Sequence, residues 1–388
     1  MSAPPADRPP APPAPRVPLR LRHVDSLRAV AALLVMFLHF DQRLTTAFAP
    51  PGGFFHFLHT LPGIVDPGRM GVMIFFAVSG FVICRSFGER EAQGGSRRFL
   101  VRRACRLYPA YWASLLGGAL VWTALGQTLT GPLLAANATM AAGWLGQPYL
   151  LGVYWTLEIE LLFYALCLGL YWLRWLERPG VLAAGALVLV SLPRLLKGVD
   201  HLAGTHLRLP PGQPTLLLSL AVMLWGTLFR LVYDETGGFR RGAYRPWSVG
   251  LLALVALALI DVPDPQFKWM LLGLRAERFP AQSAVAGAVA VFTVWVACLR
   301  WEGRTLTFLG TVSYSLYLFH VVVLELLLPV LTPGKGGGWT PPLWAGFLVC
   351  TVAAVALAAA VYRWVERPAI ALGKRLTSPR PLSSITAT

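Results

Sequence analysis

Charge is what this 388-residue chain has least of. Only 13% of its residues are charged, and 18 of them are Asp or Glu against 34 Lys or Arg. With 56% hydrophobic residues and a mean hydropathy of +0.58, this scarcity excludes an ordinary soluble protein and indicates a polytopic membrane protein. In such a protein the net charge of +16 is informative through its distribution over loops and does not by itself indicate nucleic acid.

Cysteine is also scarce, and a signal-peptide core is missing. The five cysteines show no paired spacing, and four of them lie inside apolar runs, so we expect buried thiols and no disulfide or metal site. Residues 1–19 contain eight prolines and no apolar core of signal-peptide length. We therefore predict that residues 1–20 form a disordered Pro-rich N-terminal extension and are not a cleaved leader.

Long apolar runs are abundant, and ten have about the length of a membrane span. They cover residues 24–46, 70–87, 108–126, 151–173, 180–196, 214–233, 246–261, 281–299, 308–331 and 343–363. If the N-terminus is cytoplasmic, the inner segments carry about three times as many Lys and Arg residues as the outer loops. The predicted fold is therefore all-α, with about ten transmembrane helices over residues 21–370, both termini inside, and a cytoplasmic tail at 371–388.

The ionisable side chains of the first span include Asp25, Arg28 and His39. Charged groups inside a span are costly, so each is a candidate for the functional site. Arg28 and His39 are eleven residues apart, which places both on one face of a helix and roughly 16 Å apart along its axis. This stripe predicts a functional path along the helix.

Three more ionisable residues are estimated to lie at about the same depth in the membrane as His39. They are Glu158 and Glu160 in the fourth span and His320 in the ninth. A neutral imidazole can take a proton from a hydroxyl, and a carboxylate on its other nitrogen fixes the tautomer. We therefore expect His39 to pair with Glu160 or Glu158, although a satisfied core histidine is the alternative. The two glutamates are about 200° apart on a helix and cannot both face one pocket.

A basic segment precedes the third span. It contains Arg97, Arg98, Arg102, Arg103 and Arg106. One interpretation is a topology anchor at the lipid headgroups. The other is a phosphate clamp, because Arg103 and Arg106 at i and i+3 point to one side of a helix and suit a polyphosphate-bearing donor such as coenzyme A.

Six segments in order carry a family resemblance. They are Val24–Arg28 with Arg28-x10-His39, Gly71–Phe81 including Ser79, Arg103-Ala-Cys-Arg106, Trp155–Tyr164 with its glutamate at Glu160, Leu309–His320, and Glu366-Arg367-Pro368. In this order the chain resembles the acyltransferase 3 family of membrane-integral O-acyltransferases. Met73 stands where that family often has an acidic residue. The resemblance covers residues 22 to 368, nearly the whole chain.

The resemblance implies an O-acyltransferase of the inner (plasma) membrane that moves an acyl group from acyl-CoA, a co-substrate, to a hydroxyl of a sugar or glycoside. No cofactor, metal or nucleic acid is implied. The candidate catalytic residues are His39 and Glu160, and the candidate substrate-binding residues are Arg28, Asp25, Arg102, Arg103, Arg106, Ser79 and His320. The acceptor could be a cell-surface polysaccharide, a lipid-linked sugar or a natural product such as a macrolide.

A proton-coupled transporter or flippase is the main alternative. Histidines and carboxylates at mid-membrane depth suit proton coupling equally well. The two halves of the chain, however, show no matching pair of interrupted spans, which weighs against a transporter. A sensor or scaffold would leave the arginine cluster unexplained.

Overall fold

The computed structural model describes residues 21–47, 65–87, 95–203, 209–210, 212–239, 245–260, 280–331 and 342–378. Within these ranges the chain is helical and contains no strand, so the predicted all-α class is confirmed. The predicted Pro-rich extension, residues 1–20, lies outside the described residues.

Seven helices of the described chain are long and apolar enough to cross a membrane. They are α1 (Arg22–Ala47), α3 (Pro67–Ile83), α6 (Trp155–Trp172), α7 (Pro179–Ala203), α8 (Gln213–Glu235), α13 (Ser313–Leu331) and α14 (Leu343–Val361). Three further helices coincide with predicted spans: α4 (Gly95–Ala124), α9 (Pro246–Ile260), and α11 (Pro280–Val294) with its π-helical extension Trp295–Leu299. The membrane character is thus confirmed, while the count of ten spans and the orientation stay predictions.

The predicted span 308–331 corresponds to α13, but the first residues of the prediction belong to a separate helix, α12. Helix α12 (Arg304–Thr311) ends at Val312, and α13 begins at Ser313. Helix α12 crosses α1 closely, since a Cβ added to Gly310 would lie 1.7 Å from the carbonyl oxygen of Asp25. Only glycine lets the two backbones approach this closely.

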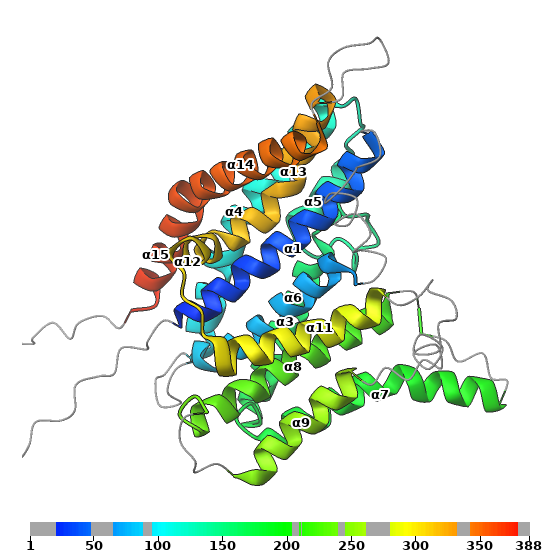
Figure 1. Ribbon diagram of the computed structural model, residues 1–388, viewed down its shortest axis with the longest axis vertical. Coiled ribbons are helices and arrows are strands. Elements are labelled where there is room, and N and C mark those ends of the chain that lie inside the picture. Colours follow the sequence, from blue (N-terminus) through cyan, green and yellow to red (C-terminus); the bar gives the residue numbers. More distant parts are fainter. Residues whose placement is uncertain are drawn as a thin grey trace, which may run out of the picture.

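Helix α3 lies at the centre of the bundle, between α1 and α8 (Figure 1). The crossing of α3 and α8 is close, since a Cβ on Gly80 would lie 1.9 Å from the Met223 carbonyl oxygen and one on Gly226 would lie 2.2 Å from that of Ala77. Helices α13 and α14 pack on the far side of α1, and α7 and α9 pack against α8 (Figure 1). The packing therefore fixes the positions of α1, α3 and α13, which carry the candidate site residues His39, Ser79 and His320.

The two ends of the described chain meet at one side of the bundle. Helix α14 continues through a π-helical segment, Tyr362–Glu366, into α15 (Arg367–Leu376), which packs against α4. Leu21 and Lys374 line the same cavity. The predicted tail from residue 371 therefore begins as a packed helix, and its residues 379–388 lie outside the described residues.

Candidate active site

Two histidines from distant parts of the sequence meet inside the bundle. His39 Nδ1, on α1, lies 2.9 Å from His320 Nε2, on α13. Their rings are stacked with centroids 5.1 Å apart, and His320 is only 1% exposed. The second nitrogen of His320, Nδ1, lies 3.2 Å from the carbonyl oxygen of Leu316. The pair is thus linked to the backbone one helical turn earlier.

This chain of contacts assigns the tautomers of the neutral pair. A carbonyl oxygen can only accept, so His320 Nδ1 carries the proton and donates it to Leu316. His320 Nε2 is then an acceptor, and His39 Nδ1 donates to it. The unprotonated nitrogen of His39 is therefore Nε2, whose lone pair can accept a proton from a hydroxyl.

The two glutamates of α6 face different surroundings, as their predicted separation requires. Glu160 Oε1 accepts from the Tyr164 hydroxyl and, at 3.5 Å, from the Ser79 hydroxyl. Glu158 is buried and accepts from the Gly143 N–H at 3.0 Å and the Tyr149 hydroxyl at 2.9 Å. Burial, followed by the contact with Glu158, raises the pKa of Tyr149 to about 12. The expected pairing of His39 with a glutamate is therefore replaced by the histidine pair.

A narrow inner cavity of about 70 Å³ lies among α1, α3, α4, α6 and α13. Its polar and aromatic lining includes Arg28, Phe75, Ser79, Arg103, Arg106, Glu160, Tyr314 and Tyr317. Tyr317 is held by Thr156, whose hydroxyl lies 2.8 Å from the phenol oxygen. The Tyr317 ring centroid lies 5.9 Å from that of His320. The cavity thus extends to within one aromatic ring of the histidine pair.

A wider cavity of about 710 Å³, called the vestibule below, adjoins the inner one. Its basic lining residues are Arg28, Arg85, Arg102, Arg103, Arg106, Arg230 and Lys374, and its acidic ones are Asp25, Asp234 and Glu366. Arg28, Arg103 and Arg106 line both cavities and so mark the passage between them. The excess of positive charge makes the vestibule suited to a polyanion.

The arginines of α4 are held in place by neighbouring side chains. Arg103 donates to the Ser86 hydroxyl at 2.6 Å and the Tyr164 hydroxyl at 3.2 Å, and it lies over the Tyr164 ring. Arg102 Nε donates to Thr377 Oγ1 at 2.8 Å. Partial burial, followed by the nearby charge of Arg98, lowers the pKa of Arg102. A bound anion would relieve this crowding of like charges.

The structure therefore divides the predicted site residues into three groups. His39 and His320 form the pair; Ser79 and Glu160 meet in the inner cavity, which Arg28, Arg103 and Arg106 share with the vestibule; Asp25 and Arg102 line the vestibule alone. Arg97 and Arg98 of the basic segment line neither cavity.

Sequence reasoning missed several residues of the vestibule. Glu366 is buried, accepts from the Ser315 hydroxyl at 2.8 Å and ends the π-helical segment before α15. Arg85 and Arg230 line the wall formed by α3 and α8. One signal could have identified Arg230, since it is the single basic residue of a strongly apolar helix.

A part-buried histidine pair, one aromatic ring away from a cavity lined by three arginines in an all-helical membrane protein, is an arrangement suited to acyl transfer. The comparisons identify the family. The chain belongs to the acyltransferase 3 family, since the family model, described as an acyltransferase domain, matches residues 21–363. The protein is thus an O-acyltransferase.

Three relatives match most of the chain. Nodulation protein 10 of Rhizobium leguminosarum bv. viciae is 27% identical and covers 92% of this chain and 95% of its own length. The exopolysaccharide production protein ExoZ of Rhizobium meliloti (strain 1021) is 27% identical, over 79% of this chain and 91% of its own. Acyltransferase MdmB of Streptomyces mycarofaciens is 27% identical over 95% of this chain and 97% of its own.

Proposed function

We propose that this protein moves an acyl group from acyl-CoA to a hydroxyl of a carbohydrate or glycosylated acceptor. One observation carries the proposal: a wide basic vestibule and a narrow inner cavity share Arg28, Arg103 and Arg106, and the inner cavity extends toward the histidine pair. This arrangement suits a donor that has a polyanionic head and a thin acyl-bearing arm.

The donor head would occupy the vestibule. Guanidinium groups bind phosphates through charge-assisted, often bidentate hydrogen bonds. Arg103 is already oriented by Ser86 and Tyr164, so little conformational freedom is lost when a phosphate binds. Arg28 and Arg106 stand at the same passage, on α1 and α4, and would hold the diphosphate where the arm enters the inner cavity.

His39 would act as the general base. Its Nε2 accepts the proton of the acceptor hydroxyl, and the hydroxyl oxygen attacks the thioester carbonyl. The resulting imidazolium keeps its Nδ1–H bond to His320 Nε2 at 2.9 Å, which stabilises the positive charge. The tetrahedral intermediate collapses, the carbon–sulfur bond breaks, and His39 returns the proton to the coenzyme A sulfur. Ester and free thiol are the products.

A covalent route would use the same residues. In that route His39 Nε2 attacks the thioester directly, coenzyme A leaves as the thiol, and the acceptor hydroxyl then takes the acyl group from the imidazole. Protein denatured rapidly at neutral pH would retain the labelled acyl group when no acceptor is present. The general-base route leaves no label on the protein.

The names of the relatives support the proposed acceptor class. ExoZ is named for exopolysaccharide production, and MdmB is named an acyltransferase. We propose that this protein likewise acts on a hydroxyl of a sugar or glycoside. We also propose that it lies in the plasma membrane, with ten spans and both termini on the cytoplasmic side. The positive-inside distribution of Lys and Arg supports this orientation.

The test uses the purified protein in lipid nanodiscs with acetyl-CoA carrying a radiolabelled acetyl group. We expect label to move to a polysaccharide, lipid-linked sugar or macrolide glycoside, with release of one thiol per ester formed. The same protein in sealed vesicles tests the alternative, because a proton-coupled transporter would move the glycoside without modifying it. Transport without any ester product would overturn the proposal.

A further inference from the structure

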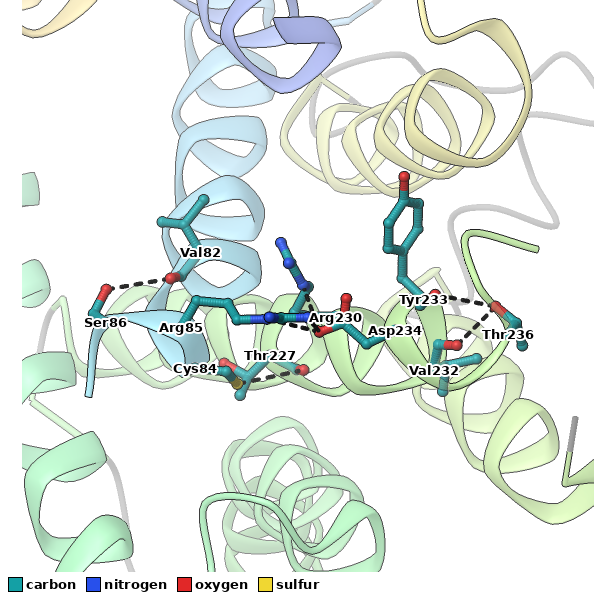
Figure 2. Close-up of polar contacts among 10 residues, drawn as sticks. All are labelled: Val82, Cys84, Arg85, Ser86, Thr227, Arg230, Val232, Tyr233, Asp234 and Thr236. Atoms are coloured by element: carbon teal, nitrogen blue, oxygen red, sulfur yellow. Dashed lines mark hydrogen bonds and ion pairs between the residues drawn. The ribbon is translucent and has the colours of Figure 1, made fainter. Parts of the chain in front are cut away.

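The wall of the vestibule formed by α3 and α8 carries a second pair of arginines. Arg85 follows α3, in the short 3-10 turn Cys84–Ser86, and Arg230 lies in the last two turns of α8. Both converge on one carboxylate oxygen, Asp234 Oδ2 (Figure 2). Arg85 reaches it with Nε at 3.1 Å and a terminal nitrogen at 2.9 Å, and Arg230 with Nε at 2.9 Å.

Arg230 is held more firmly than an ordinary surface arginine. Its side chain is 12% exposed, and its guanidinium lies 4.9 Å from the Phe81 ring centroid and 5.9 Å from that of Tyr233. Cation–π contacts of this kind restrict the side chain. The Nε of Arg230 donates to Asp234. Within the described residues, the two terminal nitrogens of Arg230 make no hydrogen bond or ion pair.

The charge at this wall is incompletely compensated. Two guanidinium groups share the single carboxylate of Asp234, which leaves one net positive charge beside the cavity. A brace between α3 and α8 would need only one arginine opposite one aspartate. A second, restrained guanidinium facing an aqueous cavity is the arrangement that binds an oxyanion.

The position of the pair along the vestibule distinguishes it from the arginines at the passage. Arg28, Arg103 and Arg106 line both cavities, whereas Arg85 and Arg230 line the vestibule alone. A phosphate bonded to the acyl-bearing arm must lie at the passage. A phosphate on another part of the head would lie elsewhere in the vestibule, where the lining residues do not reach the inner cavity.

We propose that Arg85 and Arg230, oriented by Asp234, bind a second and separate phosphate of the donor, the 3′-phosphate on the ribose of coenzyme A. The inference rests on the proposed acyl-CoA donor and makes it more specific. The site would therefore distinguish a thioester of coenzyme A from the same thioester of 3′-dephospho-coenzyme A. Arg85 and Arg230 are therefore specificity residues, and Asp234 is a positioning residue.

The experiment measures donor affinity directly, so it needs no acceptor. The full chain in nanodiscs is equilibrated with acetyl-CoA or with acetyl-3′-dephospho-CoA, each carrying a labelled acetyl group. We expect the wild-type protein to bind acetyl-CoA about 10- to 100-fold more tightly, as one or two charge-assisted bonds to a phosphate imply. In Arg230→Gln this ratio should fall toward one, with the affinity for the dephosphorylated donor unchanged.

Arg85→Gln is the second variant, because Arg85 is 60% exposed and its loss leaves the packed face of α8 intact. Lys374→Gln, on α15, should weaken the binding of both donors alike and so keep the wild-type ratio. Arg178→Gln, an exposed arginine outside both cavities, is the matched control for surface charge and should leave both affinities unchanged.

The possible results separate the two levels of the proposal. A wild-type ratio near one, or an unchanged ratio in both Arg85→Gln and Arg230→Gln, would overturn the second phosphate site while leaving the acyl-CoA donor intact. A loss of thermal stability without a change of ratio would identify the cluster as a brace between α3 and α8. Failure of the wild-type protein to bind either thioester would overturn the donor itself.

Discussion

Replacement of His320 by leucine tests the histidine pair most sharply. The change removes the acceptor that lies 2.9 Å from His39 Nδ1 and keeps an apolar side chain in the buried space. His39 can still take a proton at Nε2, but its imidazolium loses one charge-assisted hydrogen bond. Such a bond contributes about 1.5 to 3 kcal/mol, which corresponds to a decrease of about 10- to 100-fold in kcat.

The assay is steady-state transfer of labelled acetyl groups, with kcat and the donor KM measured separately. Because His320 lines neither cavity, we expect the donor KM to stay within about twofold of wild type. His320→Gln provides the matched control, since its amide oxygen can accept from His39 Nδ1 and should restore part of kcat. An unchanged kcat in His320→Leu would refute the assigned hydrogen-bond chain, and equal losses in both variants would indicate a packing role.

Three further predictions concern the vestibule, the helix crossing and the α6 carboxylate. Arg106→Gln should raise the donor KM about tenfold and change kcat little, because it removes a phosphate contact and no group that takes part in proton transfer; a kcat effect with an unchanged KM would contradict this. Gly310→Ala should lower the free energy of unfolding by about 1 to 3 kcal/mol through overpacking against α1 and so lower the Tm in detergent, whereas Gly169→Ala, whose added Cβ would meet no atom within 4 Å, should leave the Tm unchanged. Glu158→Gln should lower the free energy that keeps residues 143–149 packed against α6 by about 1 to 3 kcal/mol. The segment should then be cleaved faster in limited proteolysis, with the donor KM unchanged, and cleavage at the wild-type rate would contradict this.

Helical periodicity was sufficient for relations within one helix. The all-α class, the positions of most spans and the divergence of Glu158 from Glu160 all follow from the 3.6-residue repeat and the apolar runs. The repeat also predicted that Arg103 and Arg106 share a face, and both line the same two cavities.

The helical repeat could not predict which helices lie side by side. His39 and His320 are 281 residues apart, and an estimate of depth says nothing about which helices lie side by side. The expected carboxylate partner of His39 was therefore wrong. The break at Val312 was missed because the predicted span 308–331 ran through it, and the close packing of Gly310 on α1 appears only in the folded chain. The Arg85–Asp234–Arg230 cluster likewise exists only once α3 and α8 have met.

The most direct measurement of the proposed mechanism is acyl transfer by His39→Ala with donor binding measured on the same preparation. His39 lines neither cavity, so the variant should bind acetyl-CoA with wild-type affinity. Its transfer rate should fall by about 10²- to 10⁴-fold, the usual contribution of a general base. A folded His39→Ala protein that binds acetyl-CoA and transfers the acetyl group at the wild-type rate would contradict the central role of the histidine pair.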